Sequence, residues 1–148
     1  MIDDRGAPVR QESAETERST PASIRMDPMA TKNDLFEDMA RALEAWSTAA
    51  SEALTDPQSD LVWVEDEKPY REIQHALVAA GVPRETLAKV LSECFRGLGH
   101  SFLVALDGGT ALAEKGRLYV VDEHGSRVGE GLHDDFVGYL MDTGRLPK

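Results

Sequence analysis

The sequence lacks most of the features that anchor a protein in a membrane or around a cluster of thiolates. It has one cysteine, Cys94, so it can form no disulfide within the chain and no multi-cysteine zinc or iron–sulfur site. It has no apolar run of the roughly 18 residues that a membrane-spanning helix needs. No secretory pattern follows Met1. We therefore expect a cytoplasmic protein that does not enter a membrane.

Motifs for nucleotide binding and for the common hydrolases are also missing. The segment Asp107-Gly108-Gly109-Thr110 matches neither the dinucleotide fingerprint G-x-G-x-x-G nor the phosphate loop. Ser101 follows His100, but the G-x-S-x-G elbow of the α/β-hydrolases is absent. We therefore expect no cofactor. Catalysis would need residues that only the fold brings together.

Positive charge is scarce. The chain carries 16 Lys and Arg against 27 Asp and Glu, which gives a formal net charge of −11. Two predicted helices around Gly81 have the order of a helix-turn-helix, but the second mixes Glu93 with Lys89 and Arg96, a poor surface for reading DNA. The balance disfavours nucleic acid and anionic membranes as partners and suits a basic protein.

Large apolar side chains are also few near the N-terminus. Residues 1–30 are polar, contain proline and mix charges of both signs, so we predict a disordered tail. The remaining chain, residues 31–148, is predicted to form one small domain. Its composition, 41% hydrophobic and 29% charged over the whole chain, is that of an ordinary globular protein.

Three segments show a helical spacing of apolar residues. The spacing predicts helices over 33–54, 69–80 and 132–143. In the first, Asn33 is the expected N-cap and Trp46 belongs to a stripe that packs either in the core or in a dimer seam. The stripe of this helix consists of Phe36, Met39, Leu43, Trp46, Ala50 and Ala53.

The segment 84–106 allows two interpretations. In the favoured one it is a single helix with an apolar spine that includes Cys94 and Leu98, and Asp107-Gly108-Gly109 ends it. In the other, Gly97 and Gly99 break the helix and residues 101–106 form a buried strand. Each glycine costs about 1 kcal/mol relative to alanine inside a helix, but the helical phase is kept across both of them.

Residues 117–128 have β character. Arg117–Val121 alternates like a strand, Asp122–Gly125 has the composition of a turn, and Ser126–Val128 could return alongside. With this hairpin between the third and fourth helices, the predicted fold class is α+β and mostly helical, with four helices and a single β-hairpin.

Candidate site residues gather at the end of the third helix and the start of the fourth. Arg96, His100 and Asp107 share the polar face of the third helix and can form a charged surface or a binding pocket. His133 with Asp134 and Asp135 offers metal-ligand side chains, but neighbours on a helix diverge by about 100° and cannot converge on one ion. We therefore predict no metal site, and take Arg96, His100, Asp107 and His133 as binding candidates.

The order of a long helix, His100-Ser101, Asp107-Gly-Gly109, a hairpin and Leu132-His133-x-x-Phe136 resembles small uncharacterised bacterial domains of the single-domain accessory or immunity type, over about residues 84–145. The resemblance implies no active site. Combined with the charge, it favours a non-enzymatic interaction or inhibitor-like module with a basic protein partner. The alternative is a small hydrolase-like or metal-dependent enzyme centred on His100, Asp107 and His133. A weaker one is a transcription regulator.

Overall fold

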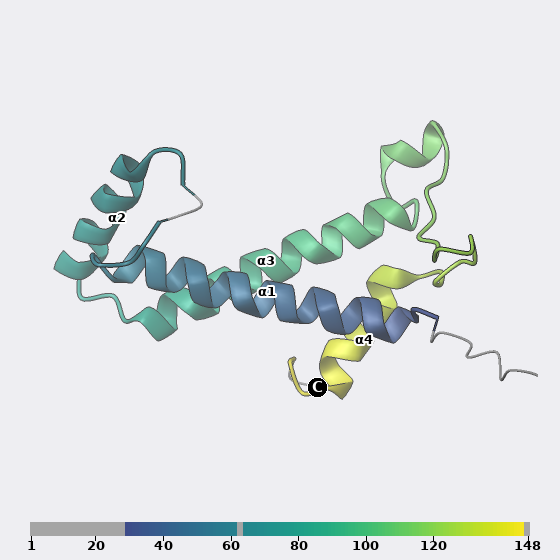
Figure 1. The fold of residues 1–148 in the computed structure, drawn as a ribbon, viewed down its shortest axis with the longest axis horizontal. Helices are drawn as coiled ribbons and strands as arrows, with labels where there is room; N and C mark the ends of the chain where they lie inside the picture. Colours follow the sequence, from purple (N-terminus) through teal and green to yellow (C-terminus); the bar gives the residue numbers. More distant parts are fainter. Residues whose placement is uncertain (1–28, 62–63, 147–148) are drawn as a thin grey trace, which may run out of the picture.

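The structure is a computed structural model that describes residues 29–61 and 64–146. These residues form helices α1 (Lys32–Thr55), α2 (Glu67–Ala79), α3 (Arg84–Leu106) and α4 (Leu132–Asp142), with a 3₁₀ turn η1 (Ala111–Glu114) before α4. Figure 1 shows α1 and α3 side by side and running in opposite directions. The α2 and η1 segments rise from the two ends of this pair, and α4 lies on its other side. Nearly all of the predicted tail, residues 1–28, lies outside the described residues.

The first helix starts at a capping box. The hydroxyl of Thr31 accepts the backbone N–H of Asp34, and the Asp34 carboxylate accepts the backbone N–H of Thr31 in return. The prediction of Asn33 as the cap was wrong by two positions, because a threonine three residues before an acidic side chain can satisfy both backbone groups. The four predicted helices are otherwise confirmed to within two residues at each end.

The core lies where α1, α3 and α4 meet. Phe36 of α1 packs against Phe136 of α4 with ring centroids 5.3 Å apart, and both rings are buried. Leu103 of α3 closes the cluster from the third side. The remaining buried members are Ala40, Leu132 and Leu140. Because this cluster draws on both ends of the chain, it holds α4 against the long helix pair.

The third helix continues through both glycines to Leu106, which confirms the favoured interpretation. Gly99 faces α1: a methyl group in place of its hydrogen would lie 3.4 Å from a Leu43 methyl. Gly97 faces open space instead. The helix ends at Leu106, with Asp107 as its C-cap, and the next residue, Gly108, has a φ of +82° that is readily available only to glycine.

The predicted β-hairpin is not formed, so the α+β fold class was wrong. In the described residues, the segment holds one isolated antiparallel bridge, between Val121 and Arg127, and the described fold is helical. The turn is as predicted, because Asp122 accepts the N–H groups of His124 and Ser126 at 2.9 Å. A two-stranded ribbon is marginal without a surface to pack on, and Leu118, Tyr119 and Val121 are exposed here.

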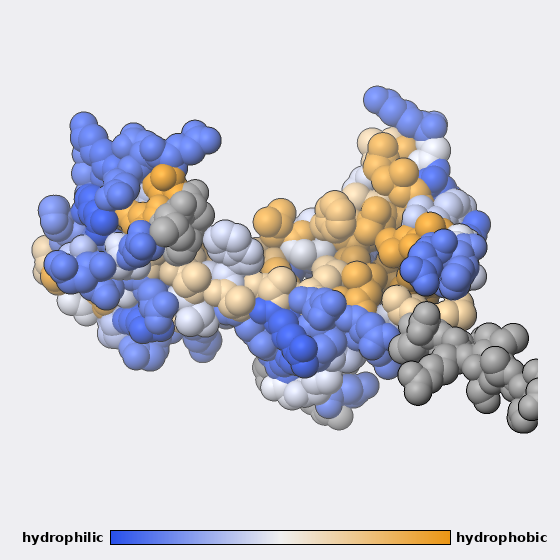
Figure 2. Space-filling model, viewed as in Figure 1, coloured by the Kyte–Doolittle hydropathy of each residue, from blue (hydrophilic) through white to orange (hydrophobic). Residues whose placement is uncertain are grey.

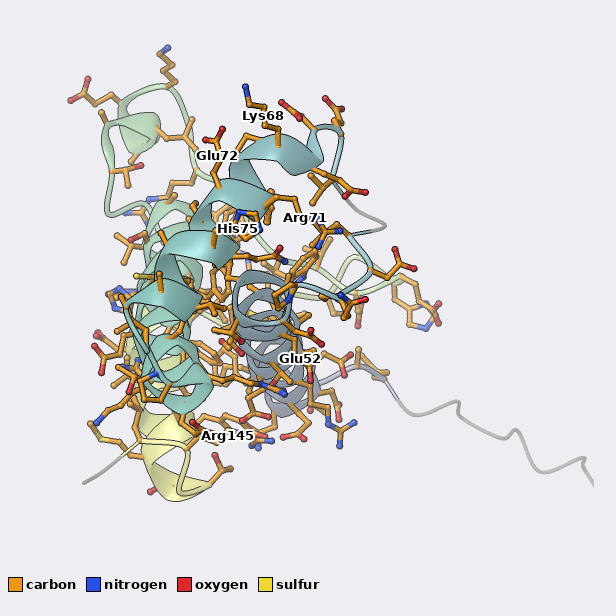
Figure 3. The ribbon with its side chains drawn as sticks, turned by 90° about the vertical axis from the view of Figure 1, so that its left-hand side faces the viewer. Glu52, Lys68, Arg71, Glu72, His75 and Arg145 are labelled. Atoms are coloured by element: carbon orange, nitrogen blue, oxygen red, sulfur yellow. The ribbon has the colours of Figure 1, made fainter. Side chains whose placement is uncertain are left out.

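Helix α2 is fastened to the end of α1 by a buried amide. The side-chain N–H₂ of Gln74 donates to the Ala53 carbonyl and, at 3.1 Å, to the Asp56 carbonyl, while its oxygen accepts from Arg71. Figure 3 shows Arg71 on the side of α2 that faces the connection from α1, and Arg71 donates to the Pro57 carbonyl there. Gln74 thus satisfies carbonyls that the end of α1 leaves without helical partners.

Gln74→Ala should detach α2. It leaves the Ala53 carbonyl buried without a donor, which costs about 1–3 kcal/mol of unfolding free energy. Urea unfolding followed by circular dichroism measures this loss, and hydrogen exchange should show faster exchange in α2 than in α4. His75→Ala, on the exposed face of α2, is the matched control and should leave both unchanged. Equal stability of the two variants would contradict the assignment.

The segment that follows α4 is held to α1 by charge. The Arg145 guanidinium contacts both Glu37 oxygens, at 3.0 and 3.1 Å, and donates to Glu44 at 2.8 Å. Tyr139 donates its hydroxyl proton to Glu37, and together with Arg145 it lowers the pKa of Glu37 to about 2. Such a bidentate pair fixes orientation as well as distance.

Candidate functional site

Two of the sequence candidates meet. Asp107 ends α3, and its Oδ2 accepts the backbone N–H of His133 at 2.9 Å and lies 2.6 Å from the His133 ring Nδ1. The Asp107 side chain is only 11% exposed. Helix α4 has Gly131 as its N-cap, which offers no side-chain acceptor. Asp107 therefore caps α4 from the end of another helix.

The contact shifts both pKa values. Burial alone would raise the pKa of Asp107, but the side-chain and backbone hydrogen bonds from His133 outweigh it, so the Asp107 pKa is lowered from its usual 3.8. The hydrogen bond to Asp107 raises the pKa of His133 from 6.5, and the nearby carboxylates of Asp134 and Asp135 add to this. The charged forms of both partners are thus favoured.

The other two binding candidates, His100 and Arg96, lie in different places. The His100 ring lies edge-on to the His133 ring with centroids 5.7 Å apart, so the fold does bring His100, Asp107 and His133 to one corner. Arg96 is not part of it. It lines a separate, small cleft of about 40 Å³ together with Glu44 and Arg145.

In the part of the chain that the structure describes, no three His, Cys, Asp or Glu side chains are placed to hold a metal ion. Asp135 pairs with Lys32, and Asp134 approaches the far ring nitrogen of His133 only to 3.6 Å.

A cavity of about 210 Å³ opens beside the Asp107–His133 pair, between the end of α3 and the segment before α4. His100 does not line it. Its polar walls include Arg117 and Glu130 as well as the pair itself. Chemically, an aspartate held on Nδ1 of a histidine can orient the ring for proton transfer. Here the same carboxylate oxygen also caps α4, so the contacts have a structural role in which they fix the start of α4 against the end of α3.

An apolar groove of about 510 Å³ lies elsewhere, between α1 and α3. All its walls are apolar or glycine: Leu43 and Trp46 come from α1, and Phe95, Leu98, Gly99 and Phe102 from α3. Leu98 is 69% exposed, Phe102 62% and Trp46 52%. Figure 2 shows this apolar band along the hollow side of the molecule, between the α2 end and the η1 end.

The groove corrects three sequence interpretations. A place in the core was one expectation for Trp46, and the spine of α3 was expected to bury Leu98 and Cys94; all three are exposed. The physical reason is that α4 covers only one side of the helix pair. Leu103, on the opposite side of α3 from Leu98, is the side chain of α3 that the core buries.

Small, uncharged side chains border the groove on both helices. On α1, Ala42 and Ala49 stand four residues before and three residues after Trp46, on the side of the helix away from Leu43. On α3, Cys94 and Ser101 stand at the same spacings from Leu98. Positions that border a helical seam often carry glutamate or lysine. Here neither border carries a charge, so an occupant can approach both helices closely.

Charge begins farther from the groove, and on both helices it begins with an acid. Each residue of a helix is rotated by about 100° from the one before it. On a helical wheel, the first charged position beyond the small border residues is Asp38 on α1, counted from Trp46, and Glu93 on α3, counted from Leu98. Both are exposed. The groove is thus an apolar strip with small, uncharged borders, and the nearest charged side chain beyond each border is acidic.

A signal for the groove was present in the sequence. Leu91, Phe95, Leu98 and Phe102 alternate at spacings of four and three, as do Met39, Leu43, Trp46 and Ala50 on α1. That spacing is the one by which helices pack in bundles. It identifies a seam, but it does not say whether the partner of the seam belongs to the same chain.

No family model, curated protein or solved structure matches the chain. The function therefore has to be argued from the chain's own geometry.

Proposed function

We propose that this chain is a protein-binding module that holds a basic protein partner in the groove between α1 and α3. The observation that carries the proposal is the run of large apolar side chains left in solvent, with Trp46, Leu98 and Phe102 all more than half exposed in one hollow. Contiguous apolar surface of this kind marks interaction sites, because leaving it in water is unfavourable.

The basic character of the partner follows from the net charge of the chain and not from the walls of the groove. The chain has a net charge of −11, and the first charged residues beyond the groove, Asp38 and Glu93, are acidic. A field of this sign steers basic proteins toward the surface and repels acidic ones. Inside the groove, Trp46 and Phe102 are of the residue type that dominates binding energy at interfaces.

The Asp107–His133 pair gives less support to the alternative, a hydrolase-like enzyme. Its carboxylate oxygen is committed to the start of α4. The hydroxyl of Ser101, the serine next to His100, donates to the Gly97 carbonyl at 2.8 Å and is used within its own helix.

Leu98→Asp should abolish partner binding. An aspartate in the middle of the groove places a charge against apolar partner atoms, which costs at least about 2 kcal/mol, or more than tenfold in affinity. The measurement is affinity capture from the native cell with the tagged chain, followed by direct titration of each captured protein. Because Leu98 is 69% exposed, the variant should remain folded.

Val78→Asp is the matched control, since Val78 is an aliphatic side chain of α2 that is 56% exposed and does not line the groove. A protein that binds the wild type and Val78→Asp but not Leu98→Asp supports the proposal. Capture of the same proteins by all three chains would refute it.

A further inference from the structure

We propose that the occupant of the groove is a single amphipathic α-helix of the basic partner, with uncharged residues toward both α1 and α3 and its lysines or arginines confined to the outward face. This rests on the proposed function and adds the shape and charge pattern of the bound element. The occupant would complete a three-helix seam of which the chain supplies two members.

The helical form follows from the backbone hydrogen bonds of the groove walls. Its lining residues all belong to α1 and α3, whose N–H and C=O groups are already paired within each helix. The groove thus has no main-chain edge to offer an extended peptide. A segment buried among Trp46, Leu98 and Phe102 must satisfy its own backbone groups, and an α-helix does so within one segment.

The spacing of the walls agrees with a helix. Phe95 and Phe102 stand seven residues apart on α3, about 10 Å or two turns, with Leu98 between them. Ridges of side chains at spacings of three and four accept the matching ridges of another helix. The occupant is therefore expected to show apolar residues at i, i+3, i+4 and i+7.

The borders of the groove determine where the occupant can carry charge. A lysine on either flank of the occupant would lie against Ala42 and Ala49 or against Cys94 and Ser101, and none of these side chains can neutralise it. The hydroxyl of Ser101 is already used by its own helix. Charge placed there would lose water without gaining a partner, so the flanks are expected to be uncharged.

The outward face of the occupant remains in solvent, where cationic side chains keep their water and are attracted by the net charge of −11 on the chain. Asp38 and Glu93 lie beyond the two borders and contribute to that negative charge. A second copy of this chain fits less well than a basic helix, since each copy brings a net charge of −11.

Four helix-stabilised synthetic peptides of about four turns test the proposal. All have leucines at i, i+3, i+4 and i+7. The first has alanines on its flanks and lysines on its outward face. The second has the lysines on its flanks and the alanines on its outward face. The third replaces the outward lysines with glutamates, and the fourth adds two central prolines to the first.

Fluorescence anisotropy with labelled peptides should show the first peptide binding most tightly. Moving the lysines to the flanks should weaken binding about tenfold, because charge then meets the uncharged borders. Outward glutamates should weaken it several-fold at low salt, with a difference that shrinks as salt screens the field. The proline peptide should bind at least about a hundredfold more weakly than the first.

The variant Ala42→Glu with Cys94→Glu supplies the charge that both borders lack. It should reverse the order of the first two peptides, so that the flank-lysine peptide binds more tightly. Both positions are exposed, so the variant should remain folded. Leu98→Asp should remove binding of every peptide, with Val78→Asp as control.

Equal binding of the first two peptides, or no binding of any peptide, would overturn the assignment. So would a dimer of the free chain that sedimentation detects and Leu98→Asp dissociates, because a second copy then fills the groove.

The two proposals fail separately. If captured cellular proteins depend on Leu98 while the peptides show no preference for charge position or helix, only the nature of the occupant is wrong. If capture is indifferent to Leu98→Asp, the binding function itself is wrong.

Discussion

Phe136→Ala is expected to lower the free energy of unfolding by about 3–5 kcal/mol, the usual cost of removing a fully buried phenylalanine side chain. Phe136 is 0% exposed and lies at the junction of α1, α3 and α4, where it packs on Phe36. The loss combines the apolar area returned to water with the cavity that rigid neighbours leave unfilled. Thermal and urea unfolding followed by circular dichroism measure it.

Phe102→Ala provides the matched comparison, because the residue type and the substitution are the same. Phe102 is 62% exposed, so its removal should change the stability by less than about 1 kcal/mol while weakening binding in the groove. The two variants thus separate a side chain that holds the fold from one that serves the proposed function. A loss of stability at Phe102 equal to that at Phe136 would mean that the groove is closed in solution.

Asp107→Ala is expected to cost about 1.5–3 kcal/mol, the range for hydrogen bonds that involve a charged group. The substitution removes both the cap of α4 and the partner of the His133 ring. Asp107→Asn should cost less, because an amide oxygen can still accept the His133 backbone N–H. Hydrogen exchange at the first turn of α4 should rise in the alanine variant and stay nearly unchanged in the asparagine variant.

The same pair predicts how stability depends on pH. The pKa of His133 is raised above 6.5 in the folded chain, so its contribution is complete below pH 6.5 and is lost as the pH rises through the folded value. The pKa of Asp107 is lowered below 3.8, so its contribution is present above pH 3.8 and is lost on further acidification. The pair therefore stabilises most between these two values. Asp107→Asn should remove the loss on the alkaline side, and an unchanged pH profile would contradict the pairing.

The helices could be predicted from the sequence because their signals are local. Apolar spacing and the stop at Gly108 depend only on neighbours along the chain, and they placed α3 correctly across Gly97 and Gly99. The predicted hairpin failed for the opposite reason. Residues 117–128 have strand composition, but a strand pair needs a surface to pack on. Val120 packs against the core, whereas Leu118, Tyr119 and Val121 are exposed.

The contact between Asp107 and His133 could not be predicted from the sequence, although both residues stood out in it. The sequence placed Asp107 and His133 on separate helices, and only the packing of α4 against α3 brings them within 2.6 Å. Trp46 and Leu98 were expected in the core but are exposed. Apolar spacing indicates that a helix face packs against something, but it does not indicate whether that surface belongs to the same chain. In the described residues, no helix is both long and apolar enough to span a membrane, as composition had suggested.

The acidity of the chain has a consequence for its behaviour before any partner arrives. An open hydrophobic groove favours self-association of the chain, whereas the repulsion between copies that each carry a net charge of −11 opposes it at neutral pH. This colloidal protection fades toward the isoelectric point of about 4.7, where the chains become neutral while their grooves remain open. Under the proposed function, the same carboxylates that keep the copies apart would attract the basic partner, and the partner would neutralise this repulsion as it covers the groove.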